Sequence, residues 1–191
     1  HILGSASAVM EIHEEGADPV RIGFSGDIGR PDRPILRDPV RLIPVDFLIC
    51  ESTYGGRRHR HAPEDEEALL RVVRDTCVRR GGKLIIPAFS IGRTQEIVYM
   101  LDRLESRGDL EGISVYVDSP LAVKATELFV QHPECYDKEI LDYMTSDPNP
   151  FGFERLHFVR DRAKSIELNS HRGPCIIISA SGMMQAGRIR H

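Results

Sequence analysis

Residues 84–96, with the sequence LIIPAFSIGRTQE, decide the fold class of this chain. The short apolar run Leu84–Ile86 is typical of a buried strand. From Arg93 to Leu104 the apolar residues recur at three-and-four spacing, which predicts a helix. A strand that leads through a small-residue loop into a helix is the unit from which parallel α/β folds are built.

The same alternation of strands and helices continues on both sides of this stretch. Ser119 before Pro120 is typical of a helix N-cap followed by a first-turn proline. Together the periodic segments predict an α/β architecture with a mainly parallel sheet. The predicted helices and strands are residues 63–80, 120–131, 134–144 and 162–170, and residues 113–117 and 175–179, respectively.

The N-terminal quarter of the chain has a different pattern. Ala8–Ile12 and Val20–Phe24 are β-branched runs joined by a turn-like loop, which predicts an antiparallel hairpin. Val45–Cys50 is a further apolar strand, after which strand–helix alternation begins. The change predicts one domain over residues 1–55 and an α/β domain over residues 56–191, truncated at its C-terminal end.

Composition narrows the class of protein. Apolar residues make up 41% of the 191-residue chain and charged residues 28%, which excludes collagen-like and disordered chains. The formal net charge of −4 does not indicate a nucleic-acid-binding protein, so any anion-binding surface must be a local patch. No apolar run approaches the ~18 residues of a membrane span, so we expect no membrane association.

The four cysteines stand far apart in the sequence, at Cys50, Cys77, Cys135 and Cys175. Two of them fall in apolar strand-like runs, and none has the paired spacing of a metal site. This usage predicts reduced core thiols and a cytoplasmic location, and disfavours a disulfide framework.

Polar, small-residue loops follow four of the predicted strands, at residues 51–55, 87–93, 118–120 and 179–183. In open α/β sheets, ligands bind beyond the carboxyl ends of the strands, where the free N–H groups of the next helix favour anions. The four loops predict a phosphate-binding cleft. For each single loop, a tight turn without a ligand is the alternative.

Residues outside these loops carry metal-binding chemistry. Asp27 follows an apolar strand and lies between two glycines that permit close approach of the backbone. Together with His1 it would supply ligands suited to zinc, while a turn aspartate and a solvated terminal histidine are the plain alternatives. His59 and His61 have ligand-like spacing, but their basic loop favours a solvated surface or an RNA-facing patch.

Six segments in a fixed order carry a resemblance to a known family. They are HILGSA (1–6), SGDIGR (25–30), ESTYGG (51–56), IPAFSIGRTQE (86–96), YVDSPLA (116–122) and ISASGMMQAGRIRH (178–191). In this order they resemble the β-CASP branch of the metallo-β-lactamase superfamily, and most of all its bacterial and archaeal RNA nucleases related to the polyadenylation cleavage endonuclease subunit. The resemblance implies part of a metallo-β-lactamase αββα fold, followed by an inserted β-CASP α/β domain.

The resemblance also implies roles for individual residues. His1 matches the third metal motif of the family, and Asp27 matches the fourth, whose carboxylate bridges two zinc ions. Glu51 matches the acidic residue at the start of the β-CASP domain, which supports proton delivery to the leaving oxygen. RNA is the implied partner, and a homodimer stays open. Contacts to the RNA backbone are implied for Ser90, Arg93, Ser181, Gly182 and Arg188.

Other parts of the family's metal site are absent from these 191 residues, namely the His-x-His-x-Asp-His motif and the later histidine motifs. The chain also opens at His1 without a Met. We therefore expect a fragment, inactive by itself, of a zinc-dependent RNA phosphodiester hydrolase. The same residues leave two alternatives open: a non-catalytic RNA-binding or scaffold paralogue, and a metallo-hydrolase that acts on DNA or another ester.

Overall fold

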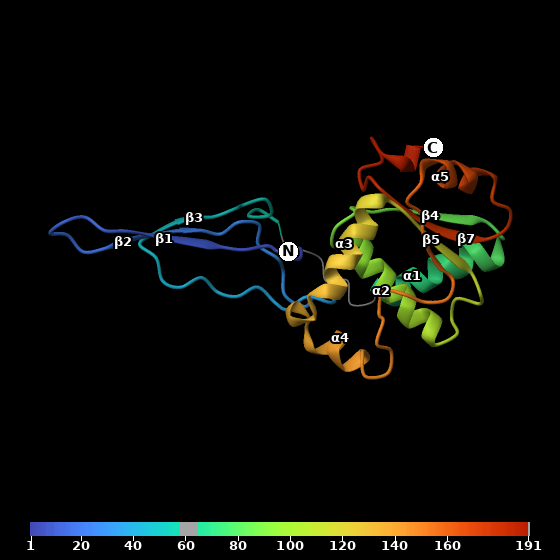
Figure 1. Ribbon diagram of the computed structural model, residues 1–191, viewed down its shortest axis with the longest axis horizontal. Helices are drawn as coiled ribbons and strands as arrows, with labels where there is room; N and C mark the ends of the chain where they lie inside the picture. Colours follow the sequence, from blue (N-terminus) through green and yellow to red (C-terminus); the bar gives the residue numbers. More distant parts are fainter. Residues whose placement is uncertain (58–64, 191) are drawn as a thin grey trace.

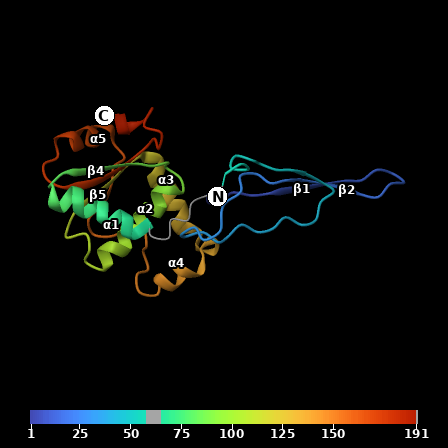
Figure 2. The same cartoon turned by 180° about the vertical axis from the view of Figure 1, so that it is seen from behind.

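The computed structural model describes residues 1–57 and 65–190 and consists of two parts (Figure 1). A three-stranded sheet within residues 1–57 forms an extended arm. A four-stranded sheet within residues 65–190, with helices on both faces, forms a compact body. Figure 2 shows the same two parts from behind. The N-terminus lies at the junction between the arm and the body.

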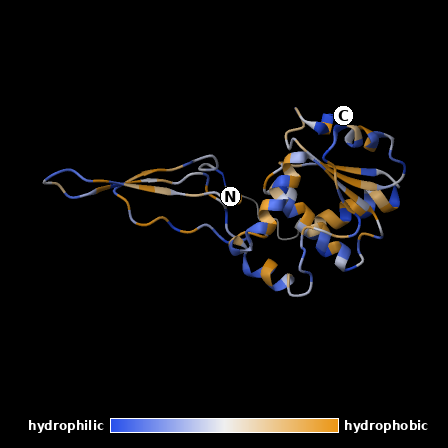
Figure 3. Ribbon diagram, in the orientation of Figure 1, coloured by the Kyte–Doolittle hydropathy of each residue, from blue (hydrophilic) through white to orange (hydrophobic). Residues whose placement is uncertain are grey.

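The arm contains the predicted hairpin. Strand β1 (Ala8–Ile12) pairs antiparallel with β2 (Val20–Phe24). Strand β3 (Phe47–Ile49) lies parallel to β2 and is shorter than the predicted strand over residues 45–50. The strands of the arm include hydrophobic residues (Figure 3). Their side chains remain exposed, with Phe47 at 63%. The loops after β2 and β3 emerge side by side, because the two strands run in the same direction.

The body is an α/β fold with a fully parallel sheet, as predicted. Its strands are β4 (Lys83–Pro87), β5 (Ser114–Asp118), β6 (Leu156–Phe158) and β7 (Cys175–Ser179), in the spatial order β4–β7–β5–β6. Strand β7 is buried along its whole length, as expected of a central parallel strand. Sequence periodicity does not predict β6, because three residues at a sheet edge are too few to show a period.

Helices cover both faces of the body sheet. One face packs against α1, α2 and α3 around a core that includes Val73 and Ile178, and the other face packs against α5 at Ile177. Helix α3 begins as predicted, because Ser119 Oγ accepts the N–H of Ala122. The helices are α1 (Asp65–Val73), which continues as a π-helix (Arg74–Arg79), α2 (Arg93–Ser106), α3 (Pro120–Gln131), α4 (Lys138–Tyr143) and α5 (Arg162–Ser170), with 3₁₀ turns at Pro133–Cys135 and Arg188–Arg190. Within the described ranges, none of these helices combines the length and hydrophobicity needed to cross a lipid bilayer.

The predicted helix over residues 134–144 is wrong in its first half. A 3₁₀ turn and α4 are separated by Tyr136, whose backbone is extended at φ −76° and ψ 149°. Tyr136 forms an antiparallel bridge with Leu36 of the arm, and its buried hydroxyl donates to the Phe129 carbonyl at 2.6 Å. Pairing with a distant segment therefore overrides the local helical pattern.

The four cysteines are free thiols, as predicted. Cys77 and Cys175 are buried, and Cys135 is half-buried. Cys50 is exposed, so its predicted place in a core is wrong. It follows β3, whose own residues are all exposed on the thin arm sheet.

Candidate functional site

The residues predicted to bind metal lie together at the junction of the arm and the body. His1 Nε2 is 3.7 Å from Asp27 Oδ2, and the two side chains are 44% and 73% exposed. Asp27 lies in the loop after β2, and Glu51 lies in the neighbouring loop after β3. The arm therefore brings one imidazole and two carboxylates to its end nearest the body.

Two glycines let the N-terminal segment approach the loop that carries Asp27. A Cβ atom on Gly29 would lie 2.3 Å from the His1 backbone nitrogen. A Cβ atom on Gly26 would lie 2.5 Å from the Ala6 carbonyl oxygen, and Gly26 has a φ of +59°. The close backbone approach predicted from these glycines is confirmed, because no larger residue fits at either position.

Glu51 is held in place by hydrogen bonds from its own and the neighbouring loop. Its carboxylate accepts the N–H of Ile28 at 2.8 Å and the N–H of Thr53 at 3.3 Å. Hydrogen bonds from Thr53 and Ile28 lower the pKa of the Glu51 carboxyl, so it is ionised at neutral pH. The buried Ser25, which sequence reasoning missed, accepts the Glu51 N–H through Oγ at 3.0 Å.

The chemistry of this donor set fits part of a zinc site. Two ligand atoms on a tetrahedral zinc ion lie about 3.4 Å apart, so His1 and Asp27 need only small rotations to contact one ion. No group of three or more histidine, cysteine or carboxylate side chains that could hold a metal occurs within residues 1–57 and 65–190. His59 and His61 lie outside the described residues. The described chain thus offers two ligands, whereas a catalytic zinc ion uses three from protein.

An open cavity of about 810 Å³ contains the His1–Asp27 pair. Its walls are the N-terminal residues, the loop after β2, residues 36–43 of the arm and Cys135 of the body. Its volume falls in the range of ~300–1,000 Å³ that is usual for sites of small molecules. The cavity joins the arm to the body, so a ligand in it would contact both parts.

The loops that follow three body strands lie together at the end of the sheet where the parallel strands terminate. Ser179 at the end of β7 lies opposite both Pro87 of β4 and Asp118 of β5. Because the three strands are parallel and end in register, the loops predicted to form a phosphate-binding cleft emerge side by side. The fourth predicted loop, residues 51–55, follows a strand of the arm sheet instead.

Side-chain contacts connect these three loops. Ser90 Oγ is 2.9 Å from Ser119 Oγ, which joins the loop after β4 to the start of α3. Gly182, in the loop after β7, packs against Phe89 so closely that a Cβ atom would lie 3.2 Å from its ring. Ser181 precedes Gly182 and its amide donates to the Ala186 carbonyl at 3.2 Å. The predicted residues Ser90, Ser181 and Gly182 therefore share one surface of the body.

A buried amide that sequence reasoning missed fixes the loop after β4. Gln95 is fully buried, and its Oε1 accepts the Gly92 N–H at 2.8 Å. Its Nε2 donates to the Ser90 carbonyl at 3.2 Å and to Thr126 Oγ1 of α3 at 2.9 Å. The signal in the sequence is a polar residue three and four positions before the apolar Val98 and Tyr99 of a predicted helix, because a polar group buried beside them needs partners.

The same loop contacts the N-terminal segment of the arm. Gly92 has a φ of +80°, and a Cβ atom on it would lie 3.0 Å from Ile2 Cγ2. Arg93 follows Gly92, and its guanidinium is 2.8 Å from Glu96 Oε2 and 44% exposed. Arg93 follows Gly92 and His1 precedes Ile2, so each is adjacent in sequence to a residue of this contact between the body and the arm.

The side chain of Arg188 is hydrogen-bonded to other residues of the body. Its guanidinium donates to Asp118 Oδ1 at 2.8 Å and to the Val159 and Arg160 carbonyls at 3.0 and 2.6 Å, with only 18% of the side chain exposed. Ser165 Oγ donates to the other Asp118 oxygen at 2.6 Å. These contacts give Arg188 a structural role, because its charge balances a buried carboxylate, and its phosphate contact stays a prediction.

Comparison with protein-family models finds a match within the body. A family model described as the Beta-Casp domain matches residues 94–191, which is about half of the chain and begins in α2. The part of the sequence that matches therefore contains α3, α4, α5 and three of the four strands of the body sheet.

Similar proteins match along almost the whole chain. Ribonuclease TTHA0252 of Thermus thermophilus is 34% identical over 191 residues, which is all of this chain and 42% of that protein. Endoribonuclease YSH1 of Yarrowia lipolytica is 32% identical over 98% of this chain and 22% of its own length. Cleavage and polyadenylation specificity factor 73 of Drosophila melanogaster is 32% identical over 100% of this chain and 26% of its own length. The chain thus spans less than half the length of these relatives.

Proposed function

Because the chain belongs to the Beta-Casp domain family, we propose that it forms part of a zinc-dependent hydrolase that cleaves RNA phosphodiester bonds. Similarity to proteins named ribonuclease and endoribonuclease supports RNA as the substrate. One observation carries the proposal: Ile2, which follows His1 on the arm, contacts Gly92, which precedes Arg93 in the loop of the body. A metal-binding group and a phosphate-binding loop are the two parts that such a hydrolase needs at one place.

The two parts of the molecule have separate tasks in this proposal. We assign residues 1–55 to a metallo-β-lactamase domain and residues 56–191 to the β-CASP domain. The described strands support this assignment, because the two sheets share no strand pair. The free thiols fit a reducing compartment such as the cytoplasm.

On the arm, His1 and Asp27 would hold zinc together with ligands from outside the described residues. When bound, zinc supplies a water of pKa ~7 and stabilises negative charge on phosphoryl oxygens. Glu51 binds the Ile28 N–H and so holds the loop in which Asp27 lies. We assign its ionised carboxylate the further task of orienting a proton donor beside the leaving oxygen.

On the body, Ser90, Arg93, Ser181 and Gly182 would contact RNA phosphates. Hydroxyl groups, a guanidinium and loop N–H groups recognise phosphate charge and not the identity of a base. Binding is therefore expected to tolerate many RNA sequences. Arg93 is the main cation of this set, since its side chain reaches solvent while one nitrogen stays paired with Glu96.

The proposal is tested by Asp27→Asn in the protein that carries this chain. An amide lacks the negative charge that the Asp27 carboxylate would supply to zinc, so RNA cleavage should fall by more than the ~10–100-fold that follows loss of a residue that only supports a metal ligand. Zinc content by elemental analysis should fall as well. Asp18→Asn, at an exposed turn of the arm, is the matched control and should keep both.

Three other outcomes would contradict parts of the proposal. Unchanged zinc content and turnover in Asp27→Asn would show that Asp27 is only a turn residue. Wild-type protein that binds RNA without cleaving it would support the scaffold alternative. Faster hydrolysis of a DNA strand than of the matching RNA would identify DNA as the substrate.

A further inference from the structure

One glutamate that the proposed chemistry does not use joins the arm to the body. Glu96 lies in the first turn of α2, and its side chain is only 9% exposed. Its Oε1 accepts a hydrogen bond from Arg33 of the arm, and its Oε2 lies 2.8 Å from Arg93 of the body. A carboxylate this buried is stable in a fold only when it is paired, and here two guanidinium groups share it.

Arg33 begins a docked segment, residues 33–37, in which the arm is attached to the body. The Asp137 N–H donates to the Ile35 carbonyl at 2.8 Å, and the Arg37 N–H donates to the Cys135 carbonyl at 3.1 Å. Ile35 is 1% exposed and belongs to the core of the body. The arm is thus anchored by backbone pairing and one buried side chain, and the ion pair lies at the start of this segment.

The second arginine on Glu96 belongs to the loop proposed to contact RNA. Arg93 follows Gly92, which contacts Ile2 of the arm, and Ile2 follows His1. The guanidinium of Arg93 is partly exposed and could adopt many conformations, and the ion pair to Glu96 favours one of them. One carboxylate therefore sets both where the arm is docked and where this guanidinium lies.

We propose that Glu96 is a positioning residue that fixes the His1–Asp27 pair of the arm relative to the phosphate-contacting loop of the body. It acts through Arg33 and Arg93 and does not touch the substrate. The inference rests on the proposed function in one respect, because the distance that it fixes matters for catalysis only if RNA bridges the two groups. Catalysis is sensitive to such a distance, since a displacement of ~1 Å can reduce a rate ~100-fold.

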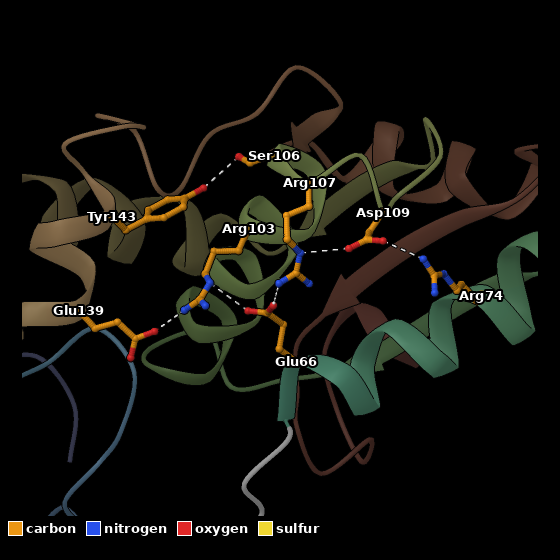
Figure 4. A network of polar contacts seen from close by, with 8 residues as sticks. All are labelled: Glu66, Arg74, Arg103, Ser106, Arg107, Asp109, Glu139 and Tyr143. Carbon is orange, nitrogen blue, oxygen red and sulfur yellow. Dashed lines mark hydrogen bonds and ion pairs between the residues drawn. The ribbon is translucent and has the colours of Figure 1, made fainter.

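The structure offers a matched control for a charge-removing substitution. Glu66 on α1 also binds two guanidinium groups, with Arg103 at 3.0 Å and Arg107 at 2.5 Å, but all three residues belong to the body (Figure 4). Glu96→Gln and Glu66→Gln therefore remove the same charge from similar ion pairs. Of the two glutamates, Glu96 pairs with a residue of the arm, so Glu96→Gln is expected to affect the attachment of the arm.

Hydrogen exchange of the Arg37 and Asp137 amides measures docking directly, without any activity. In the protein that carries this chain, both amides should exchange at least ~10-fold faster in Glu96→Gln and in Arg33→Gln. They should stay within ~2-fold of wild type in Glu66→Gln and in Arg33→Lys, which keeps the positive charge. The amides of β7 report on global unfolding and should be unchanged in every folded variant. Equal exchange at Arg37 and Asp137 in Glu96→Gln and Glu66→Gln would overturn the inference.

RNA cleavage by the same variants tests the link to catalysis. Arg33→Gln leaves the Arg93–Glu96 pair intact, so kcat per folded protein should fall ~10–100-fold with little change in KM. Glu96→Gln should lower kcat and also raise KM, because Arg93 loses its partner. Arg33→Lys should restore most of kcat. Wild-type kcat in Arg33→Gln despite faster exchange would overturn the positioning role.

The two proposals fail in different ways. Wild-type protein that cleaves no RNA contradicts the proposed function. The exchange rates of the Arg37 and Asp137 amides would still confirm or overturn the docking role of Glu96.

Discussion

Asp102 is fully buried in α2, and among residues 1–57 and 65–190 only one of its carboxylate oxygens finds a hydrogen-bond partner. Tyr143 donates its hydroxyl to Asp102 Oδ2 at 2.7 Å, while Oδ1 and the buried hydroxyl of Tyr99 have no partner in the part of the chain that the structure describes. Burial raises the pKa of Asp102 to about 6 and raises the pKa of Tyr143 as well. The folded state therefore favours the protonated carboxyl.

The raised pKa predicts how stability depends on pH. In the unfolded chain the carboxyl titrates near pH ~4, so its contribution to stability is complete below that pH and is lost as the pH rises through about 6. Asp102→Asn removes this titration and keeps an acceptor for Tyr143. The unfolding free energy of the variant minus that of wild type should therefore increase by about 1 kcal/mol from pH 5 to pH 8.

Urea unfolding at the two pH values measures this effect. The exposed Glu154→Gln is the control and should follow wild type at both pH values. A difference between Asp102→Asn and wild type that does not change with pH would show that Asp102 titrates alike in the folded and unfolded chains.

At the scale of an element, α2 and the loop before it are held by Gln95. Each polar group of this buried amide has a partner, and the partners lie in the loop after β4 and in α3. The buried side chain of Gln95 therefore fixes the conformation of the loop that contains Ser90 and Arg93. A satisfied polar group of this kind favours a single conformation of the loop.

Gln95→Met keeps the length of the side chain but removes its amide. It leaves the Gly92 N–H and the Ser90 carbonyl without their partner, at about 1 kcal/mol for each lost hydrogen bond, so we expect a loss of about 2–3 kcal/mol in unfolding free energy. Denaturant unfolding measures the loss. Gln131→Met, at the exposed end of α3, should change stability by less than ~0.5 kcal/mol. Equal effects of the two substitutions would show that the buried network contributes nothing to the fold.

At the scale of the whole molecule, Ile35 connects the arm to the core of the body. It is 1% exposed and has a φ of +79°, a left-handed conformation that is costly for a β-branched residue. The surrounding contacts must outweigh this cost, and the bridge between Leu36 and Tyr136 is one of them. The relative position of the two parts thus depends on a side chain that belongs to one part and is buried in the other.

Ile35→Ala should leave a cavity where the arm meets the body. Loss of a buried isoleucine typically costs about 2–4 kcal/mol, and here the loss should also loosen the arm, which limited proteolysis detects as faster cleavage within residues 30–45. Ile43→Ala, at a site that is 57% exposed in the same segment, is the matched control. The role of Ile35 in docking is wrong if both variants are cut at the wild-type rate.

The sequence by itself determined the elements whose signals are local. Ser119 and Pro120 define the start of α3, and the apolar run Cys175–Ser179 defines a buried central strand. The arm hairpin follows from two β-branched runs and a turn. Each of these signals depends on residues within about one helical turn or one strand of each other, so it can be seen in the sequence.

The candidate site depended on another kind of information. The order and the identity of six sequence motifs indicated His1, Asp27 and Glu51. The structure places His1 within 3.7 Å of Asp27. No periodicity predicts that distance. It follows from the antiparallel pairing of β1 with β2, from the parallel pairing of β2 with β3, and from glycines at the points of close approach.

Only the tertiary structure decided the contacts between distant segments. Tyr136 is extended because it pairs with Leu36, and Arg188 is engaged because it meets Asp118, 70 positions away. Glu96 joins the two parts because Arg33, 63 positions away, reaches it across the junction. Buried charges and extended backbone must find partners wherever the fold brings them, and these partners are set by packing in three dimensions, which local sequence does not encode.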